Sequence, residues 1–204
     1  MVIRQVSRRR FLQTGLCGLA AGAGLGLPLV RESSPAWALT RIRPPGALDA
    51  RDFDAACIRC GLCVEACPYD TLRLLESDGS AQGGTPYFVA REVPCEMCAD
   101  IPCLRACPTG ALDPGLERIE DAAMGVAVLS HPEFCNSYVG NSFCDSCVRA
   151  CPLQGLAISL AVGPTPMGGL FTPTVDPDVC TGCGKCEHDC IAPSAAIRVA
   201  PRHA

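Results

Sequence analysis

The sequence predicts an α+β fold in which one small unit, made of short strands and helices around a cysteine loop, is repeated four times. Sixteen of the 17 cysteines fall in four tight clusters of four. The first cysteines of these clusters are residues 57, 95, 135 and 180, so the repeats are spaced by 38, 40 and 45 residues. Such regular spacing indicates an array of one supersecondary unit. Two consecutive units form one module, and the chain is therefore expected to contain two modules.

Each unit is expected to run from the cysteine loop through a helix or turn, which opens near the fourth cysteine, into a short strand. Proline follows the fourth cysteine in three clusters, and because proline fixes its own φ and lacks an N–H, it can end a loop and open a helix. Apolar runs rich in β-branched residues predict strands, whereas Gly, Pro and Ser predict loops. The expected strands are residues 71–75, 87–93, 125–130, 156–160 and 195–199, and the expected surface loops are residues 77–85 and 163–169.

The spacing of the cysteines predicts iron–sulfur chemistry. The first cluster reads CIRCGLCVEACP, the C-x2-C-x2-C-x3-C-P run of bacterial ferredoxins. In that run three cysteines bind one cubane, and the fourth, before proline, ligates a second cubane. The chain is therefore expected to form two ferredoxin-like modules that bind four [4Fe-4S] clusters. The predicted iron ligands are Cys57, Cys60, Cys63, Cys67, Cys95, Cys98, Cys103, Cys107, Cys135, Cys144, Cys147, Cys151, Cys180, Cys183, Cys186 and Cys190.

Three of the four clusters depart in detail from this run. Four residues separate Cys98 from Cys103, eight separate Cys135 from Cys144, and Ile191 stands where the other clusters have proline. Because the entropy of loop closure grows only with the logarithm of loop length, the longer loops can still bring their cysteines to a cubane.

Disulfides and zinc sites are the alternatives for a cysteine-rich chain. Neither requires a third cysteine after two residues and a fourth after three more, before proline. His188, between Cys186 and Cys190, is interpreted as solvated or as tuning the nearby cluster rather than as a ligand. Lys185, the single lysine, is either a surface side chain or one that raises a cluster potential. Because no P-loop, nucleotide fingerprint or Ser/His/Asp group occurs outside the first 38 residues, we predict no catalytic residue and an electron carrier rather than an enzyme.

The composition predicts that metal binding stabilises the fold. Aromatic residues make up only 5% of the chain, which also has 20 glycines and 18 prolines, so an ordinary apolar core would be thin. When ligands are disordered in the unfolded chain, the binding free energy of the metal becomes folding free energy. The apo chain is therefore expected to be largely unfolded.

The first 38 residues have the pattern of a twin-arginine signal peptide. The stretch from Ser7 to Leu12 carries adjacent arginines, an apolar, glycine-rich stretch follows, and Ala-Trp-Ala at 36–38 forms a small-x-small cleavage site. An uncleaved membrane anchor is the alternative, but the apolar stretch spans about 17 residues, fewer than the ~20 of a spanning helix. We therefore expect a signal at 1–38, a four-cluster region at 39–204 with motifs at 57–67, 95–107, 135–151 and 180–190, and folded export to the periplasm.

Removal of the signal would leave an acidic protein. Residues 1–38 contain five arginines and one acidic residue, so 12 basic and 20 acidic residues remain, a net charge of −8. A protein with this charge is not expected to bind nucleic acid. The charge suits docking against the basic faces of redox partners, because complementary charge speeds encounter.

Beyond its cysteines, the sequence resembles the NapG/MauM ferredoxin-type proteins. The resemblance lies in RIRPPGALD (41–49), CIRCGLCVEACPYDTL (57–72), GTPYFVAREVPCEMCADIPCLRACPTGALD (84–113), AAMGVAVL (122–129) and PTVDPDVCTGCGKCE (173–187). It implies four [4Fe-4S] clusters and a relay of electrons from a membrane-bound, quinol-oxidising iron–sulfur protein (NapH-like) towards a periplasmic cytochrome or nitrate reductase. The alternative that it implies is a maturation or accessory factor for a periplasmic enzyme such as methylamine dehydrogenase. Membrane association would come through the partner or an uncleaved signal.

A second resemblance concerns which cysteines share a cluster. The second motif is similar to that of the four-cluster subunits of molybdenum oxidoreductases, in which the first motif pairs with the fourth and the second with the third. This resemblance implies a nested grouping, and sequential pairing of neighbouring motifs is the alternative. The nested groups are Cys57, Cys60, Cys63 and Cys190; Cys67, Cys180, Cys183 and Cys186; Cys95, Cys98, Cys103 and Cys151; and Cys107, Cys135, Cys144 and Cys147.

Overall fold

The computed structural model describes residues 41–76 and 82–202, which all belong to one compact unit, Leu39–Ala204. The predicted signal peptide at 1–38 lies outside the described residues, and its assignment stays a prediction. Within the described stretches, helices and strands are mixed and short, and none of these helices has the length and apolar character needed to cross a membrane.

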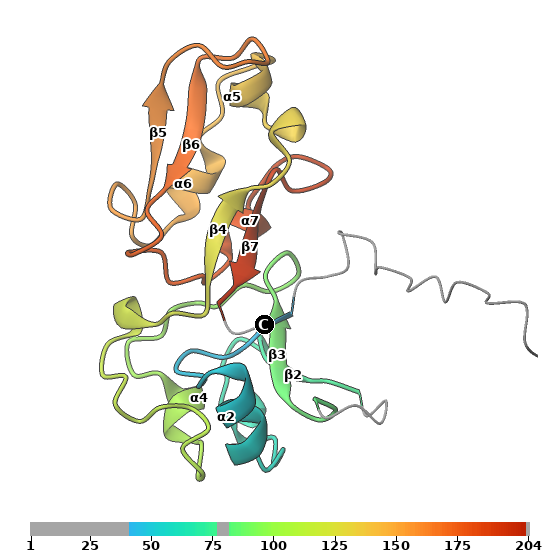
Figure 1. Cartoon of the computed structure of the whole chain (residues 1–204), viewed down its shortest axis with the longest axis vertical. Coiled ribbons are helices and arrows are strands. Elements are labelled where there is room, and N and C mark those ends of the chain that lie inside the picture. Colours follow the sequence, from blue (N-terminus) through green and yellow to red (C-terminus); the bar gives the residue numbers. More distant parts are fainter. Residues whose placement is uncertain (1–40, 77–81, 203–204) are drawn as a thin grey trace, which may run out of the picture. The chain divides into compact units, whose positions relative to one another are not determined.

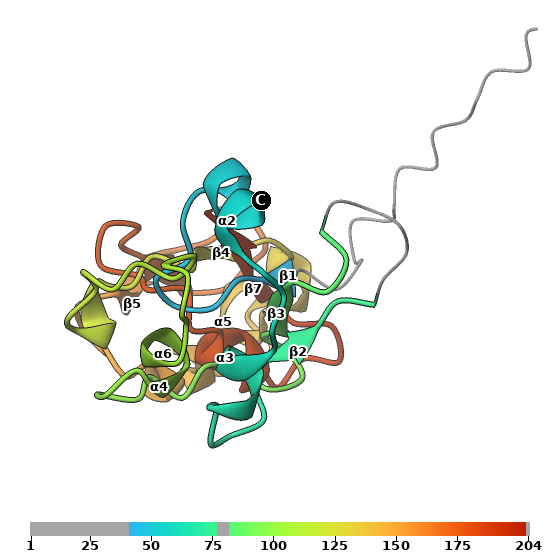
Figure 2. The same ribbon diagram turned by 90° about the horizontal axis from the view of Figure 1, so that it is seen from below.

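The first half of the unit, which contains β2 and β3 in Figure 1, is built around a three-stranded antiparallel sheet of order β1-β3-β2 (Figure 2). Arg41 pairs with Val89 on one side of β3, and Arg73 pairs with Tyr87 on the other. The elements of this half are β1 (Arg41–Ile42), α2 (Ala50–Ala56), α3 (Leu62–Glu65), β2 (Arg73–Leu74), β3 (Pro86–Val89), α4 (Pro102–Arg105) and the 3-10 helix η1 (Ile119–Asp121).

The second half contains two antiparallel pairs, β4 with β7 and β5 with β6. The β4–β7 pair runs in register from Gly125 opposite Pro201 to Leu129 opposite Ile197. The elements of this half are β4 (Gly125–Leu129), the 3-10 helix η2 (Pro132–Phe134), α5 (Asn136–Val139), α6 (Ser146–Ala150), β5 (Ile158–Val162), β6 (Phe171–Val175), α7 (Lys185–His188) and β7 (Ile197–Pro201).

The strands lie near the predicted positions but differ in length. The predicted strand 87–93 ends at Val89, because the N–H groups of Glu92 and Val93 donate to the Val89 carbonyl oxygen and turn the chain. Strand β6 was not predicted, since Pro173 interrupts its apolar run. In the structure Pro173 pairs with Leu160 in a two-stranded sheet, where proline is tolerated because each strand is an edge.

Of the helix or turn predicted near the fourth cysteine, the structure has the turn. Instead of opening near the fourth cysteine, α3, α4, α6 and α7 carry the third cysteine of each motif and end just before the fourth. The proline after the fourth cysteine begins a turn, as at Pro68 and Pro152, and not a helix. Helix α7 begins after Gly184 at φ 87°, and a Cβ at this residue would lie 2.4 Å from the Ala90 Cβ. This close approach therefore requires glycine.

These four helices are packed in pairs, α3 with α4 (Figure 2) and α6 with α7. Each has only four or five residues, too few to be stable alone. The core around them holds few large side chains, and the largest buried apolar ones are Phe53, Phe88, Ile42, Ile197 and Val199. Cysteines from all four motifs belong to the same hydrophobic cluster or pack against it, so the thiols share the core with a modest number of aliphatic and aromatic side chains.

Candidate metal centres

The sixteen predicted ligands surround four cavities, four cysteines to each, and all sixteen are free thiols. The cavities have volumes of about 350, 410, 390 and 380 Å³ and are named A, B, C and D in that order. Cavity A is lined by Cys57, Cys60, Cys63 and Cys107; cavity B by Cys67, Cys95, Cys98 and Cys103; cavity C by Cys151, Cys180, Cys183 and Cys186; and cavity D by Cys135, Cys144, Cys147 and Cys190.

This arrangement departs from the nested grouping and follows the sequential alternative. Cys107, and not Cys190, completes the set of the first motif, while Cys190 joins the third motif. Likewise Cys67 lies with the second motif, and Cys151 with the fourth. The reason is the pairing of the helices: consecutive motifs close on each other through α3 and α4, or through α6 and α7, before the chain reaches the next half.

Each short helix serves two cavities. Cys63 within α3 lines cavity A, whereas Cys67, two residues after the helix ends, lines cavity B. Helix α4 does the reverse, with Cys103 at cavity B and Cys107 at cavity A. Helices α6 and α7 repeat this exchange for cavities D and C. The two cavities of each half are thus linked by two short helices, each of which is followed by a cysteine of the other cavity.

The long gap in the third motif is taken up by an ordered turn. Helix α5 (Asn136–Val139) fills the first half of the segment between Cys135 and Cys144. Ser137, only 2% exposed, donates its hydroxyl to the Cys144 carbonyl oxygen at 2.5 Å and accepts the Cys144 N–H at 2.8 Å. The six residues that this gap has beyond the two of the ferredoxin run therefore leave Cys144 fixed at cavity D.

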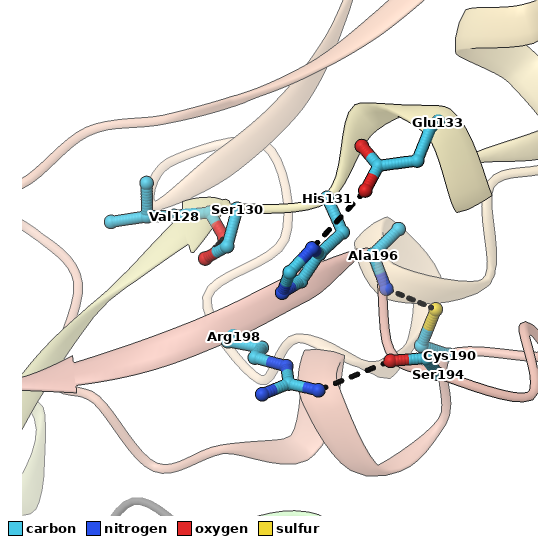
Figure 3. A network of polar contacts seen from close by, with 8 residues as sticks. All are labelled: Val128, Ser130, His131, Glu133, Cys190, Ser194, Ala196 and Arg198. Carbon is cyan, nitrogen blue, oxygen red and sulfur yellow. Dashed lines mark hydrogen bonds and ion pairs between the residues drawn. The ribbon is translucent and has the colours of Figure 1, made fainter. Parts of the chain in front are cut away.

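The cavity walls are mainly apolar, and backbone donors approach some of the sulfurs. At cavity C the Ala127 N–H donates to Cys180 Sγ at 3.4 Å. At cavity D the Ala196 N–H donates to Cys190 Sγ at 3.4 Å (Figure 3). The turn that presents Ala196 is braced by Arg198, whose Nη2 donates to Ser194 Oγ at 3.1 Å. Hydrogen bonds of this kind stabilise a thiolate and tune the potential of a metal bound to it.

Burial keeps many of these thiols neutral in the absence of a cation. Burial raises the pKa of the Cys63 thiol to about 11, and repulsion from Cys57 and Cys60 adds to the shift. Burial raises the pKa to about 12 for each of Cys95, Cys103 and Cys147. Because iron binds thiolates, its charge must offset this cost, and binding must release protons.

The residues present fit iron–sulfur clusters. Every cavity has the three-plus-one set of thiols that the ferredoxin motif provides, with apolar walls and backbone donors to sulfur. In the described part of the chain, no three Cys, His, Asp or Glu side chains converge as the ligands of a single metal ion. Each set of four sulfurs instead stands around a cavity, as ligands of a multi-iron group do.

The other side chains singled out from the sequence make structural contacts. His188 is exposed, and its Nδ1 lies 3.1 Å from the Arg91 carbonyl oxygen. Lys185 forms an ion pair with Glu96. Arg91 itself was missed, because its hydrogen-bond partners are roughly a hundred residues away in the sequence and no local pattern marks it.

Comparison with known proteins agrees with this division into halves. The 4Fe-4S dicluster domain family matches residues 56–111, which contain the cysteines of cavities A and B, and residues 125–194, which contain those of cavities C and D. The chain is 52% identical to the methylamine utilization ferredoxin-type protein MauM of Methylorubrum extorquens, over 96% of this chain and 90% of that protein. It is 48% identical to the ferredoxin-type protein NapG of Escherichia coli K12, over 97% of this chain and 87% of that protein. The chain therefore belongs to the NapG and MauM ferredoxin-type proteins, a family of iron–sulfur electron-transfer proteins.

Proposed function

We propose that the chain binds four [4Fe-4S] clusters, one in each of cavities A to D, and acts as an exported electron relay without catalytic activity of its own. The observation that carries this proposal is the presence of four free thiols around every one of the four cavities. A bound [4Fe-4S] cluster supplies reversible one-electron oxidation and reduction.

The protein's own part is to hold and insulate these sites. The short helices present thiolates to two cavities at once, which keeps the sites of one half close together. Apolar side chains such as Leu72 and Phe88 at cavity B exclude water. The backbone donors at Cys180 and Cys190 stabilise negative charge on the sulfurs. These features allow an electron to be gained or lost with little rearrangement of the chain.

We propose a route from a membrane-bound, quinol-oxidising iron–sulfur protein to a periplasmic cytochrome or reductase of the nitrate reductase type, with the chain as an accessory subunit of that system. The similarity to NapG and the acidic charge of −8 for residues 39–204 support this route. A second candidate is a maturation or accessory role for a methylamine-oxidising enzyme, which the MauM relatives favour by name and by 52% identity.

Deletion of the gene separates these two roles. For the relay, we expect quinol-dependent turnover to fall to a small fraction of the wild-type rate, while the isolated terminal enzyme keeps full activity with an artificial donor. The reason is that only the supply of electrons is interrupted. Both rates are measured in the deletion strain and in a complemented strain. A terminal enzyme that is inactive with every donor would instead support the maturation role.

The proposed periplasmic location rests on Arg8 and Arg9. Replacement of both by lysine keeps the charge of the segment but removes the arginine pair that the export route recognises. We expect the variant to accumulate in the cytoplasm with its clusters bound, as fractionation and immunoblotting would show. The matched control is Arg31→Lys, which lies outside the pair and should be exported normally. Normal export of the double variant would contradict the assignment.

A further inference from the structure

The two halves meet through the second and fourth cysteine motifs, which belong to cavities B and C. The N–H of Cys95, at cavity B, donates to the carbonyl oxygen of Cys183, at cavity C, at 2.8 Å. One residue further along each loop, Glu96 also lines cavity B, and Gly184 also lines cavity C. The backbones approach so closely at this point that Gly184 has no room for a side chain beside Ala90.

Two side-chain contacts reinforce the same meeting point. Lys185, the first residue of α7, forms an ion pair with Glu96. Thr181 Oγ1, beside cavity C, lies 3.5 Å from the sulfur of Met97. The Cys95–Cys183 hydrogen bond and these two side-chain contacts join residues 95–97 to residues 181–185, and this pair of segments is called the B–C junction below.

Arg91 fastens the second half to the first beside this junction. It lies two residues after β3, in the first half, and its guanidinium reaches the end of α7 and the loop that follows. Nη1 donates to the carbonyl oxygens of Glu187, His188 and Cys190 at 2.7, 2.9 and 2.7 Å, and Nη2 donates to that of Ala192 at 2.9 Å. One side chain thus holds the segment that carries cysteines of both cavity C and cavity D.

We propose that electrons pass between the two halves at the B–C junction, in the linear order A–B–C–D, and that Arg91 is the positioning residue for this step. The proposal rests on the proposed function, because it requires the four cavities to hold clusters. The step is a transfer of one electron between cavities B and C: one occupant is oxidised by one electron, the other is reduced by it, no bond forms or breaks, and no proton moves. Cavities A and D are then the outer sites at which external donors and acceptors exchange electrons.

The choice of arginine follows from the geometry. Three carbonyl oxygens lie around Nη1, whose two N–H groups must share them, and Nη2 serves the fourth, so the set spans both ends of the guanidinium fork. An ammonium group has three donors at a single point and cannot span the same set. Because the rate of electron transfer falls steeply with separation, a small displacement of this segment should slow the B–C step while leaving exchange within each half unchanged.

The junction can be tested first in the unmodified holoprotein. Lys185 is the only lysine of the chain, so a carbodiimide, which joins an amine to a carboxylate without a spacer, has one side-chain amine to react with. We expect mass spectrometry of the digested protein to show Lys185 joined to Glu96, and Glu96→Gln to abolish that product. Failure to find the Lys185–Glu96 product in the iron-loaded protein would overturn the junction, whatever the clusters do.

The role of Arg91 is tested by substitution, with Arg73→Ala as the matched control. Arg73 pairs with Glu92 on the surface of the first half, so its loss should leave the junction unaffected. After flash photoreduction, electrons in the Arg91→Ala variant should redistribute between the halves about tenfold more slowly than in wild type. The reason is that a misplacement of ~1 Å can lower a rate by up to ~100-fold. Weakened magnetic coupling between reduced clusters in EPR should accompany the slower rate.

Arg91→Lys provides a second variant if the alanine variant loses iron, and we expect intermediate slowing. Unchanged redistribution in an Arg91 variant with wild-type iron content would overturn the positioning role. Wild-type protein that lacks iron would refute the proposed function instead, and the cross-link would still report on the junction. Iron analysis of every sample therefore separates the two failures.

Discussion

Removal of iron and sulfide should leave the chain without a cooperative thermal transition. Twelve cysteines belong to its hydrophobic core or pack against it, and the helices that carry the third cysteine of each motif span four or five residues each. Neither these helices nor the two-stranded sheets are stable alone. In small metal-dependent domains metal binding supplies of order 10 kcal/mol to folding. Because a typical domain is stable by only about 5–15 kcal/mol, the loss of four such sites should unfold this one.

The measurement is circular dichroism during heating of holoprotein and of apoprotein, both kept anaerobic with reduced thiols. The holoprotein should show a sharp transition, and reconstitution of the apoprotein with iron and sulfide should restore it. A reduced, iron-free chain that melts cooperatively near the temperature of the holoprotein would show that side-chain packing alone sustains the fold.

Cys107→Ala should remove the cluster of cavity A and lower the iron content by about four of about sixteen atoms per chain. In the structure Cys107 completes the set of Cys57, Cys60 and Cys63. Iron and acid-labile sulfide, together with spin counts from EPR, measure the loss. The wild-type value of about sixteen is itself the test of four clusters.

Pairs of substitutions make this measurement a test of grouping. Cys63→Ala combined with Cys107→Ala should lose no more iron than either single variant, because both thiols serve cavity A. Cys63→Ala combined with Cys190→Ala should lose about eight atoms, because Cys190 serves cavity D. A loss of only about four atoms in the second pair would reinstate the nested grouping.

The cysteines that line the four cavities could be picked out from the sequence because the pattern that marks them is local. Three cysteines within seven residues, as at Cys57, Cys60 and Cys63, must lie on one loop, and a loop of this length brings them to a common site. The strands could be placed approximately for the same reason, since a short run of β-branched residues indicates its own conformation. Strand β6 was not predicted because Pro173 interrupts its apolar pattern. A proline is tolerated at residue 173 because β6 has a single partner strand, β5.

The grouping could not be derived in this way, because it depends on tertiary contacts. The intervals between successive motifs are nearly equal, so chain length permits Cys107 or Cys190 to reach the first motif equally well. Pairing of α3 with α4 decides between them, and helices of four residues leave almost no amphipathic pattern in the sequence. The role of Arg91 could not be predicted from the sequence either. Its hydrogen-bond partners are backbone carbonyl oxygens, which every residue has.

The ordered turn at the third motif bears on how readily cavity D changes its oxidation state. A ligand at the end of a loose eight-residue loop would move towards solvent whenever the bound group gained one negative charge, and that movement would add to the reorganisation energy of each electron transfer. Cys144 is denied this freedom, because the buried hydroxyl of Ser137 holds both its N–H and its carbonyl oxygen. The longer loop therefore does not make cavity D more flexible. The oxidised and reduced forms should have the same geometry at Cys144.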